Sequence, residues 1–358
     1  LMPKDFVAHR LTGRMVTDYS DASGTNLFDI RAKRWCEDIA GEIGLELSTL
    51  PPALPSTSTV AGLDSWAAEE LGLRRGVPVI IGGGDGPCAT AGAGASGPGI
   101  CYNSYGTSSW NAVATGQPLY DAKRRTFILC HLDPDRYMTA GTMQFAGGSF
   151  EWLNGWLGAT EGTLAQGLGL SSYDLLSLEA ERAEPASGGV LFLPYLLGER
   201  SPYWDPEVTG AFIGLTRSTG RGEIIRAVLE GTVYHLKLIL DVLIENGAVF
   251  DEVRLIGGGG RSGLLRKLMA DIWGVPVVPM RYLEEASSLG AALAGLVGIG
   301  ARPSMEEAVS LVRKGEQVAP DPAAHQRYQR YYPLFGEAYH ALREVNKKIH
   351  AAQNAGRD

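Results

Sequence analysis

The sequence predicts an α/β protein of two domains, and three observations lead to that prediction. Short runs rich in Val and Ile alternate with helical stretches along most of the chain, which is typical of a layered and largely parallel sheet. The length of 358 residues exceeds the roughly 150 residues of one ordinary domain, which favours two. Gly97-Pro98-Gly99 is the clearest break between structured stretches, so we expect domains at residues 1–98 and 99–358.

The first domain is expected to contain several helices and one buried strand. Helical spacing and capping residues predict helices over residues 5–11, 33–43, 65–73 and 88–95. Asp18 and Asp21 lie in a stretch dense in capping residues and are interpreted as caps. Residues 77–81 form a short apolar run rich in β-branched side chains, which predicts the buried strand, and Gly82-Gly83-Gly84-Asp85 follows directly.

The second domain is expected to contain most of the strands. Two of them fold around Gly106-Thr107, and two closing helices are separated by Pro333, which cannot donate a backbone hydrogen bond. We expect strands at residues 100–105, 109–114, 126–131, 136–141, 190–195, 253–256 and 275–279. We expect helices at residues 147–157, within 160–188, and at 223–245, 262–273, 287–298, 322–332 and 334–352.

The composition argues against several kinds of partner. The formal charge is −8 and basic residues are scattered, which argues against binding to nucleic acid or to an anionic membrane surface. No apolar run reaches the ~18 residues of a membrane span, and no signal peptide is visible. The four cysteines lack CxxC spacing and the six histidines lack HxxxH spacing. We therefore expect reduced thiols in a cytoplasmic protein, and no metal site built from protein side chains alone.

Three glycine-rich turns follow or join predicted strands, at residues 82–86, 106–107 and 257–260. Glycine lets backbone N–H groups approach an anion closely, and a helix that follows adds its positive end. One such turn is most often structural, whereas three in one chain favour a site that handles phosphate. Asp85 lies in the first turn, where a carboxylate can act as a general base or hold a Mg²⁺-bound water; a turn cap is the alternative.

A dinucleotide site is an alternative for the last of these turns. Gly258-Gly259-Gly260-Arg261-Ser262-Gly263 satisfies GxGxxG after a predicted strand and before a predicted helix. The acidic residue that would hold the ribose at the tip of the next strand is missing. A dehydrogenase that uses NAD through residues 258–263 remains a second interpretation, while the absence of GxxxxGK[ST] excludes a P-loop.

A longer pattern in the second domain is similar to that of a known family. GAFIGL at residues 210–215, EI at 223–224 and AVLE at 227–230 together resemble the carboxy-terminal signature of FGGY-type carbohydrate kinases. Other matching segments follow in the family's order: PKD, LTG and TDYSDAS within residues 3–23, GGGD at 82–85, YGTSS at 105–109, LGERSP at 197–202 and IGGG at 256–259. The resemblance covers essentially the whole chain and is closest to xylulokinases.

The resemblance implies an actin-like (ribonuclease H-like) two-domain ATPase fold with the active site between the domains. Residues 1–98 would be the latter part of the amino-terminal sugar-binding domain, and residues 99–358 the carboxy-terminal ATP-binding domain. The implied reaction transfers phosphate from ATP, with Mg²⁺, to a hydroxyl of a small ketose or polyol, above all xylulose. The family's first phosphate loop and most sugar contacts would precede Leu1. The first domain is therefore expected to be incomplete, and the chain alone to be inactive as a kinase.

The resemblance also implies roles for single residues. Asp85 is similar to the catalytic base that accepts the proton of the sugar hydroxyl, and Gly86 stands where xylulokinases often have Asn or Gln. Seven residues match nucleotide-binding positions: Gly106 and Thr107 in a phosphate loop, Gly147 and Glu151 as a nucleotide-side pair, and Gly258, Gly259 and Ser262 in an adenosine-binding turn. Neither turn contains lysine, so Mg²⁺ would neutralise the phosphates. A non-catalytic actin-like sensor of nucleotide or sugar is the remaining alternative, and a homodimer is compatible with either.

Overall fold

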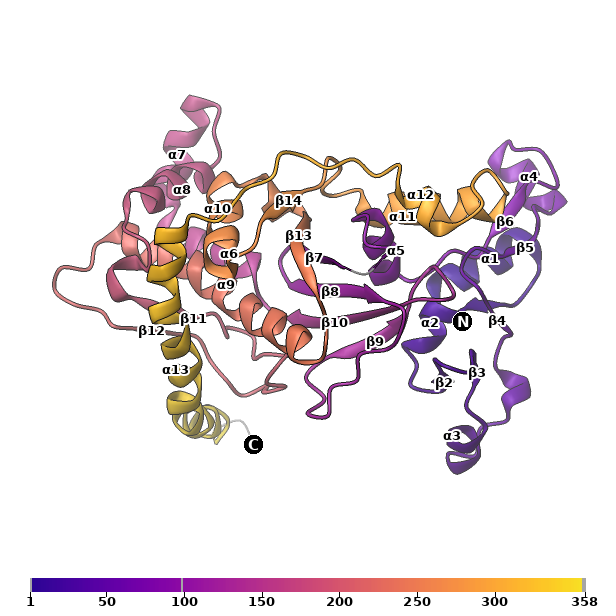
Figure 1. The fold of residues 1–358 in the computed structure, drawn as a ribbon, viewed down its shortest axis with the longest axis horizontal. Coiled ribbons are helices and arrows are strands. Elements are labelled where there is room, and N and C mark those ends of the chain that lie inside the picture. Colours follow the sequence, from indigo (N-terminus) through magenta and orange to yellow (C-terminus); the bar gives the residue numbers. More distant parts are fainter. Residues whose placement is uncertain (1, 98, 356–358) are drawn as a thin grey trace.

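A computed structural model describes residues 2–97 and 99–355, so Pro98, at the predicted domain boundary, lies outside the described residues. The centre of the molecule is a six-stranded sheet in the order β14-β13-β7-β8-β10-β9, with helices on both faces (Figure 1). Its strands are β7 (Gly99–Tyr105), β8 (Ser109–Thr115), β9 (Phe127–Cys130), β10 (Tyr137–Met143), β13 (Phe250–Ile256) and β14 (Val277–Pro279).

The central sheet is mixed. β13 runs parallel to both β14 and β7, whereas β7 with β8, β8 with β10, and β10 with β9 are antiparallel. The expectation of a largely parallel sheet is therefore wrong. The reason lies in the connections: β7 joins β8, and β9 joins β10, through short turns that suit antiparallel neighbours, whereas a parallel pair needs a long crossover.

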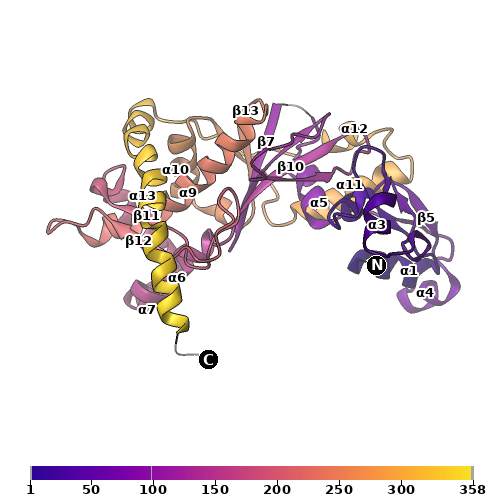
Figure 2. The same ribbon diagram turned by 90° about the horizontal axis from the view of Figure 1, so that it is seen from below.

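Alternate residues of the strands face opposite sides of the sheet, and helices cover each side (Figure 2). On one side, Cys101, Val113 and Met143 join a large core with α6 (Gly147–Leu157), α9 (Arg221–Glu245), α10 (Gly263–Trp273) and α13 (Pro322–Asn354). On the other side, Tyr102 and Ala112 pack against a smaller core formed with α5 (Asp85–Gly92) and α11 (Ala286–Gly298). The sheet thus separates two cores and carries a helix layer on each.

α5 and α11 touch at backbone level, although they come from different predicted domains. A Cβ on Gly92 would lie 1.8 Å from the carbonyl oxygen of Ala286, and one on Gly290 would lie 1.9 Å from that of Cys88. Such distances exclude any side chain, so only glycine permits this approach. The helix that begins with Asp85 is therefore held by a helix from the second half of the chain.

The first part of the chain forms short helices and two-stranded sheets at one end of the molecule (Figure 1). β6 (Pro78–Ile80) corresponds to the strand expected at residues 77–81, but it pairs antiparallel with β5 (Thr59–Gly62) and is partly exposed instead of buried. An apolar run of this length favours a strand without telling which sheet it joins. The other elements here are α1 (Pro3–Thr12), α2 (Tyr19–Ser23), α3 (Glu37–Glu42), α4 (Ser65–Leu71), β1 (Thr17–Asp18), β2 (Phe28–Asp29), β3 (Arg34–Trp35) and β4 (Ala53–Leu54).

Two helix predictions need correction. α3 begins at Glu37 and not near residue 33, because β3 pairs with β2. The two closing helices are one, α13, which continues through Pro333. Pro333 and Gln329, whose carbonyl loses its intrahelical partner, are both exposed, so water can take the place of the missing N–H.

The remaining elements are α7 (Ala159–Leu168), α8 (Ser172–Arg182), α12 (Met305–Val309), β11 (Leu191–Leu193), β12 (Ala211–Ile213) and the 3₁₀ turns η1 (Leu47–Thr49), η2 (Ser187–Gly189) and η3 (Gly258–Arg261).

The thiols and several general features can be read from the same structure. All four cysteines are free; Cys88, Cys101 and Cys130 are buried, whereas Cys36 is half-buried. Over residues 2–97 and 99–355, no helix is both long and apolar enough to cross a membrane. In the same part of the chain, no group of three or more His, Cys, Asp or Glu side chains is placed to hold a metal ion.

Candidate active site

The turns that follow β7, β10 and β13 meet at one edge of the central sheet because of the register of its strands. β13 and β7 are parallel with Ile256 beside Ser104, so the turns that follow these two strands leave the sheet side by side. β10 is antiparallel to β8 with Met143 beside Ser109, so the chain leaves β10 next to the hairpin turn at residues 106–108. The sheet topology therefore brings together segments that are about 40 and 150 residues apart in the sequence.

These turns border a cavity of about 890 Å³, a size suited to a small-molecule ligand. Every residue that the sequence analysis assigned to nucleotide binding lines it: Gly106, Thr107, Gly147, Glu151, Gly258, Gly259 and Ser262. The three stretches that supply these residues have no sequence proximity that would place them together. Their convergence is a property of the fold.

Another part of the cavity wall was not expected from the sequence. It is formed by α8 and the residues before it, with Tyr173, Ser177 and Leu178 among the lining side chains, and by Phe150 from α6. The stretch 160–188 was interpreted only as helical and polar, and nothing in its pattern singles out these side chains. Their hydroxyl and apolar groups form a mixed surface that suits a nucleoside better than a phosphate.

The hairpin turn at Gly106-Thr107 is fixed by the start of α6. The backbone N–H of Ala146 donates to the carbonyl of Thr107 (2.8 Å), that of Gly147 donates to Gly106 (2.9 Å), and that of Gly148 donates to Thr107 (3.1 Å). A Cβ on Gly147 would lie 2.5 Å from the Gly106 carbonyl oxygen. Gly147 is thus required for packing, and the first N–H groups of α6 hold the hairpin.

The turn after β13 packs closely against Tyr105. Gly257 adopts a φ of +87°, and a Cβ there would lie 2.5 Å from the Tyr105 carbonyl oxygen; one on Gly259 would lie 2.3 Å from the Tyr105 ring. The Tyr105 hydroxyl shares a 2.8 Å hydrogen bond with that of Thr232 inside the core. Ser262 caps α10, since its hydroxyl oxygen accepts the N–H of Leu265 at 3.2 Å. Its hydroxyl hydrogen is left to donate.

The charged side chains of the cavity are mostly acidic. Among the described residues, Glu151, Asp174 and Glu181 line it together with one cation, Arg261, and with no lysine. Arg261 forms an ion pair with Glu284 at 3.0 Å, and both side chains are exposed, so this pair is weak. A polyphosphate in this cavity would therefore need a counter-ion that it brings with it.

Asp85 lies elsewhere and in a different setting from the one expected. It is the first residue of α5 and is exposed, instead of ending a buried strand, because β6 belongs to the small, partly exposed β5–β6 sheet. Its Oδ1 accepts the N–H of Gly86 at 2.7 Å. Within the described residues it is not among those that line the cavity. Hydrogen bonds link its helix to the central sheet: the Tyr102 hydroxyl of β7 donates to the Gly86 carbonyl at 3.3 Å and lies 3.0 Å from the Thr90 hydroxyl of α5.

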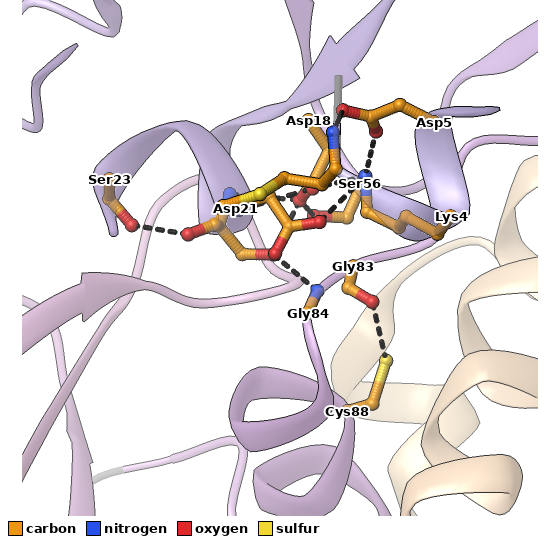
Figure 3. A network of polar contacts seen from close by, with 11 residues as sticks. Lys4, Asp5, Asp18, Asp21, Ser23, Ser56, Gly83, Gly84 and Cys88 are labelled. Atoms are coloured by element: carbon orange, nitrogen blue, oxygen red, sulfur yellow. Dashed lines mark hydrogen bonds and ion pairs between the residues drawn. The ribbon is translucent and has the colours of Figure 1, made fainter. Parts of the chain in front are cut away.

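A buried polar network behind the Asp85 turn was missed by the sequence analysis (Figure 3). Asp18 is the N-cap of α2, as expected, but its carboxylate is fully buried and also pairs with Lys4. Asp21 was expected to be a cap as well, yet its carboxylate lies 3.2 Å from the Lys4 ammonium. These contacts join residues from different elements of the chain, so no local sequence pattern predicts them.

Comparison with known proteins gives a consistent result. Residues 1–92 match the N-terminal domain, and residues 101–299 the C-terminal domain, of the FGGY family of carbohydrate kinases. The xylulose kinase of Bacillus subtilis is 30% identical over 350 residues, which are 98% of this chain and 68% of that protein. The gluconokinase of Bacillus licheniformis is 32% identical over 349 residues, 97% of this chain and 67% of that protein.

Solved structures agree with the sequence matches. A xylulose kinase from Lactobacillus acidophilus superposes with a TM-score of 0.89 at 27% identity, covering 97% of this chain and 68% of that one. A gluconate kinase from the same organism gives the same TM-score at 28% identity and the same coverage. The predicted actin-like two-domain fold is confirmed, and neither the dehydrogenase nor the sensor interpretation is retained, because these relatives are carbohydrate kinases. The chain belongs to the FGGY family of carbohydrate kinases.

Proposed function

We propose that the protein transfers the γ-phosphate of Mg-ATP to a hydroxyl of a small sugar, with xylulose as the first candidate substrate. The observation that carries this proposal is the convergence of all seven predicted nucleotide-binding residues on one cavity. Residues 1–98 would contribute to the sugar site and residues 99–358 would bind ATP. Closure of the two parts would bring the sugar to the phosphate and exclude water from the reaction.

For the nucleotide, we assign the phosphates to the hairpin turn and the nucleoside to the start of α10. Gly106 and Thr107 are exposed at the cavity and offer backbone N–H groups and a hydroxyl to the β- and γ-phosphates. Gly258, Gly259 and Ser262 would contact the adenosine beside the first turn of α10, where Ser262 has a hydroxyl hydrogen to donate.

The acidic lining of the cavity supports a role for Mg²⁺. Mg²⁺ is usually bound by one or two carboxylates together with substrate phosphates and water, so it does not require a cluster of protein ligands. Glu151, on the helix that holds the phosphate hairpin, is the residue we assign to a Mg²⁺-bound water. The bound ion would neutralise charge on the phosphates, which Arg261, a lining cation already paired with Glu284, does not balance.

Asp85 is proposed as the general base that accepts the proton of the attacking sugar hydroxyl. Its carboxylate is exposed, and only Oδ1 is engaged, by the N–H of the next residue. Oδ2 makes no hydrogen bond within the described part of the chain, so it is open to a substrate hydroxyl. In the intact protein, Asp85→Asn is expected to lower kcat by about 10²–10⁴-fold while leaving the affinity for ADP unchanged.

The identity of the sugar substrate is less constrained than that of the nucleotide. Xylulose kinases and gluconokinases are similar to this chain at about the same identity, 30% and 32%. A panel of xylulose, gluconate and glycerol, assayed with the intact protein and Mg-ATP by release of ADP, would identify the acceptor. We expect turnover with xylulose above that with gluconate. Wild-type turnover of the Asp85→Asn variant, or a protein that binds NADH and not ADP, would contradict the proposal.

A further inference from the structure

The turn that precedes Asp85 is pressed against α2. The backbone N–H of Gly84 donates to the hydroxyl oxygen of Ser20 at 2.9 Å. A Cβ on Gly83 would lie 2.8 Å from the same oxygen, and a Cβ on Gly84 would lie 2.7 Å from Oδ1 of Asp21. A Cβ on Gly83 would also lie 2.3 Å from the side chain of Leu132. Contacts with α2 and with Leu132 together therefore leave little room for a side chain at these two positions.

Ser20 is itself held rigidly. Its hydroxyl donates to Oδ2 of Asp18 at 2.6 Å, its backbone N–H donates to the same oxygen at 2.8 Å, and the Ser56 hydroxyl donates there as well at 2.6 Å. Asp18 is fully buried and Ser20 is 2% exposed. With three donors on one carboxylate oxygen, the direction of the Ser20 hydroxyl is set, and its oxygen lone pair points to Gly84.

The other oxygen of Asp18 is paired with a cation. Oδ1 lies 2.8 Å from the ammonium of Lys4, which is also 2.6 Å from Asp5 and 3.2 Å from Asp21 (Figure 3). Asp5 is almost completely buried and Lys4 is largely so. α1, α2 and the turn before α5 are thus tied together by a network with one shared carboxylate, and buried pairs of this kind are costly to break.

The geometry points to Ser20 and Asp18 as positioning residues for Asp85. Gly84 is the N-cap of α5 and the residue directly before Asp85, so a hydrogen bond to its N–H sets the direction in which the chain enters that residue. This inference rests on the proposed role of Asp85 as general base. A catalytic group displaced by about 1 Å can lose about 10²-fold in rate, so a single hydrogen bond next to it is enough to matter.

Ser23 offers a matched control for a purely structural effect. It lies on the same helix, is 7% exposed, and also makes two hydrogen bonds: its hydroxyl donates to the Ser20 carbonyl at 2.6 Å and accepts the N–H of Cys130 at 3.0 Å. Its partners are α2 itself and β9, and not the turn before Asp85. Ser23→Ala therefore removes a comparable buried hydroxyl without releasing Gly84.

The test compares Ser20→Ala with Ser23→Ala in the intact protein, by steady-state kinetics and thermal unfolding. Ser20→Ala is expected to lower kcat by about 10–100-fold while the KM for ATP stays within about two-fold, because Ser20 does not line the nucleotide cavity. Ser23→Ala is expected to lower the melting temperature similarly and to leave kcat within about two-fold. Equal kcat in the two variants would overturn the inference.

A double substitution separates this inference from the one on which it rests. If Ser20 acts through Asp85, adding Ser20→Ala to Asp85→Asn lowers kcat no further, whereas a multiplied loss overturns the inference. Wild-type turnover in Asp85→Asn alone would reject both the base and its positioning. If Ser20→Ala does not fold, Ser56→Ala removes one donor to Asp18 and keeps the Ser56 carbonyl, which accepts the N–H of Gly82 at 3.0 Å. A kcat lowered several-fold then supports the inference, and a wild-type kcat refutes it.

Discussion

Gly147 gives the sharpest test of how the nucleotide cavity is built. Gly147→Ala would place a Cβ 2.5 Å from the Gly106 carbonyl oxygen, against the roughly 3.4 Å of an ordinary contact, so α6 and the hairpin must separate by about 1 Å. Overpacking of this kind costs about 1–3 kcal/mol of unfolding free energy. The same shift weakens the hydrogen bonds from Gly147 and Gly148 to the hairpin, which we proposed to hold the phosphates.

Gly155 is the matched control on the same helix. A Cβ at Gly155 would have no atom within 4 Å, so Gly155→Ala should raise the unfolding free energy by up to about 1 kcal/mol through helix propensity alone. The assay is urea unfolding combined with titration of ADP. We expect Gly147→Ala to be destabilised and to bind ADP about ten-fold more weakly, a loss of about 1.4 kcal/mol. Gly147→Ala that matches Gly155→Ala in both measurements would refute the packing argument.

Three further substitutions test packing, capping and a buried charge. Gly290→Ala, whose Cβ would lie 1.9 Å from a carbonyl oxygen of α5, should lower the unfolding free energy by about 1–3 kcal/mol, whereas Gly295→Ala on the same helix, with no atom within 4 Å, should lose none. Ser262→Ala removes the cap of α10 and should cost about 1 kcal/mol in urea unfolding. Burial raises the pKa of Glu199 from 4.5 to about 8 and lowers the pKa of the adjacent His235 from 6.5 to about 4. Between pH 4.5 and 6.5 these two groups change the stability in opposite directions. Above pH 6.5, of the two, only Glu199 keeps in the folded state a proton that it loses in the unfolded chain. The free energy of unfolding should therefore fall towards pH 8 by up to about 1.4 kcal/mol per pH unit, and Glu199→Gln should abolish this fall.

Local patterns predicted the elements that border the cavity. The hairpin expected at residues 100–105 and 109–114 is observed as β7 and β8, and the helix expected at 147–157 is α6 with the same bounds. Both follow from apolar periodicity and from glycines at the turns, which depend on neighbouring residues only. That the turns after β7, β10 and β13 belong to one site was predicted only through the family resemblance. The parallel register of β13 with β7 is a physical cause of their proximity.

What the sequence did not predict depends on distant partners. Residues 77–81 were expected to form a buried strand, because their apolar residues cannot indicate that β5 is the strand beside them in a small, partly exposed sheet. The Gly82–Gly86 turn was interpreted as approaching a phosphate, whereas Gly83 and Gly84 lie against Ser20 and Asp21, more than 60 residues earlier in the chain. Pro333 was expected to end a helix, but the exposed side of α13 tolerates it. In the first two cases a contact between separate elements decided the outcome, and at Pro333 exposure to water did.

Gly106 and Gly258 differ from the glycines around them, and the difference is itself a prediction. Neither has a positive φ, and a Cβ would meet nothing closer than 3.5 Å at Gly106 and 3.4 Å at Gly258. Because packing and backbone conformation do not require glycine at these two positions, close approach of a ligand to the backbone is the remaining physical reason for it. Gly106→Ala and Gly258→Ala should therefore unfold like the wild type in urea and yet bind ADP at least about ten-fold more weakly. If both variants bind ADP normally, the nucleotide does not lie against these turns, and the cavity must serve another ligand.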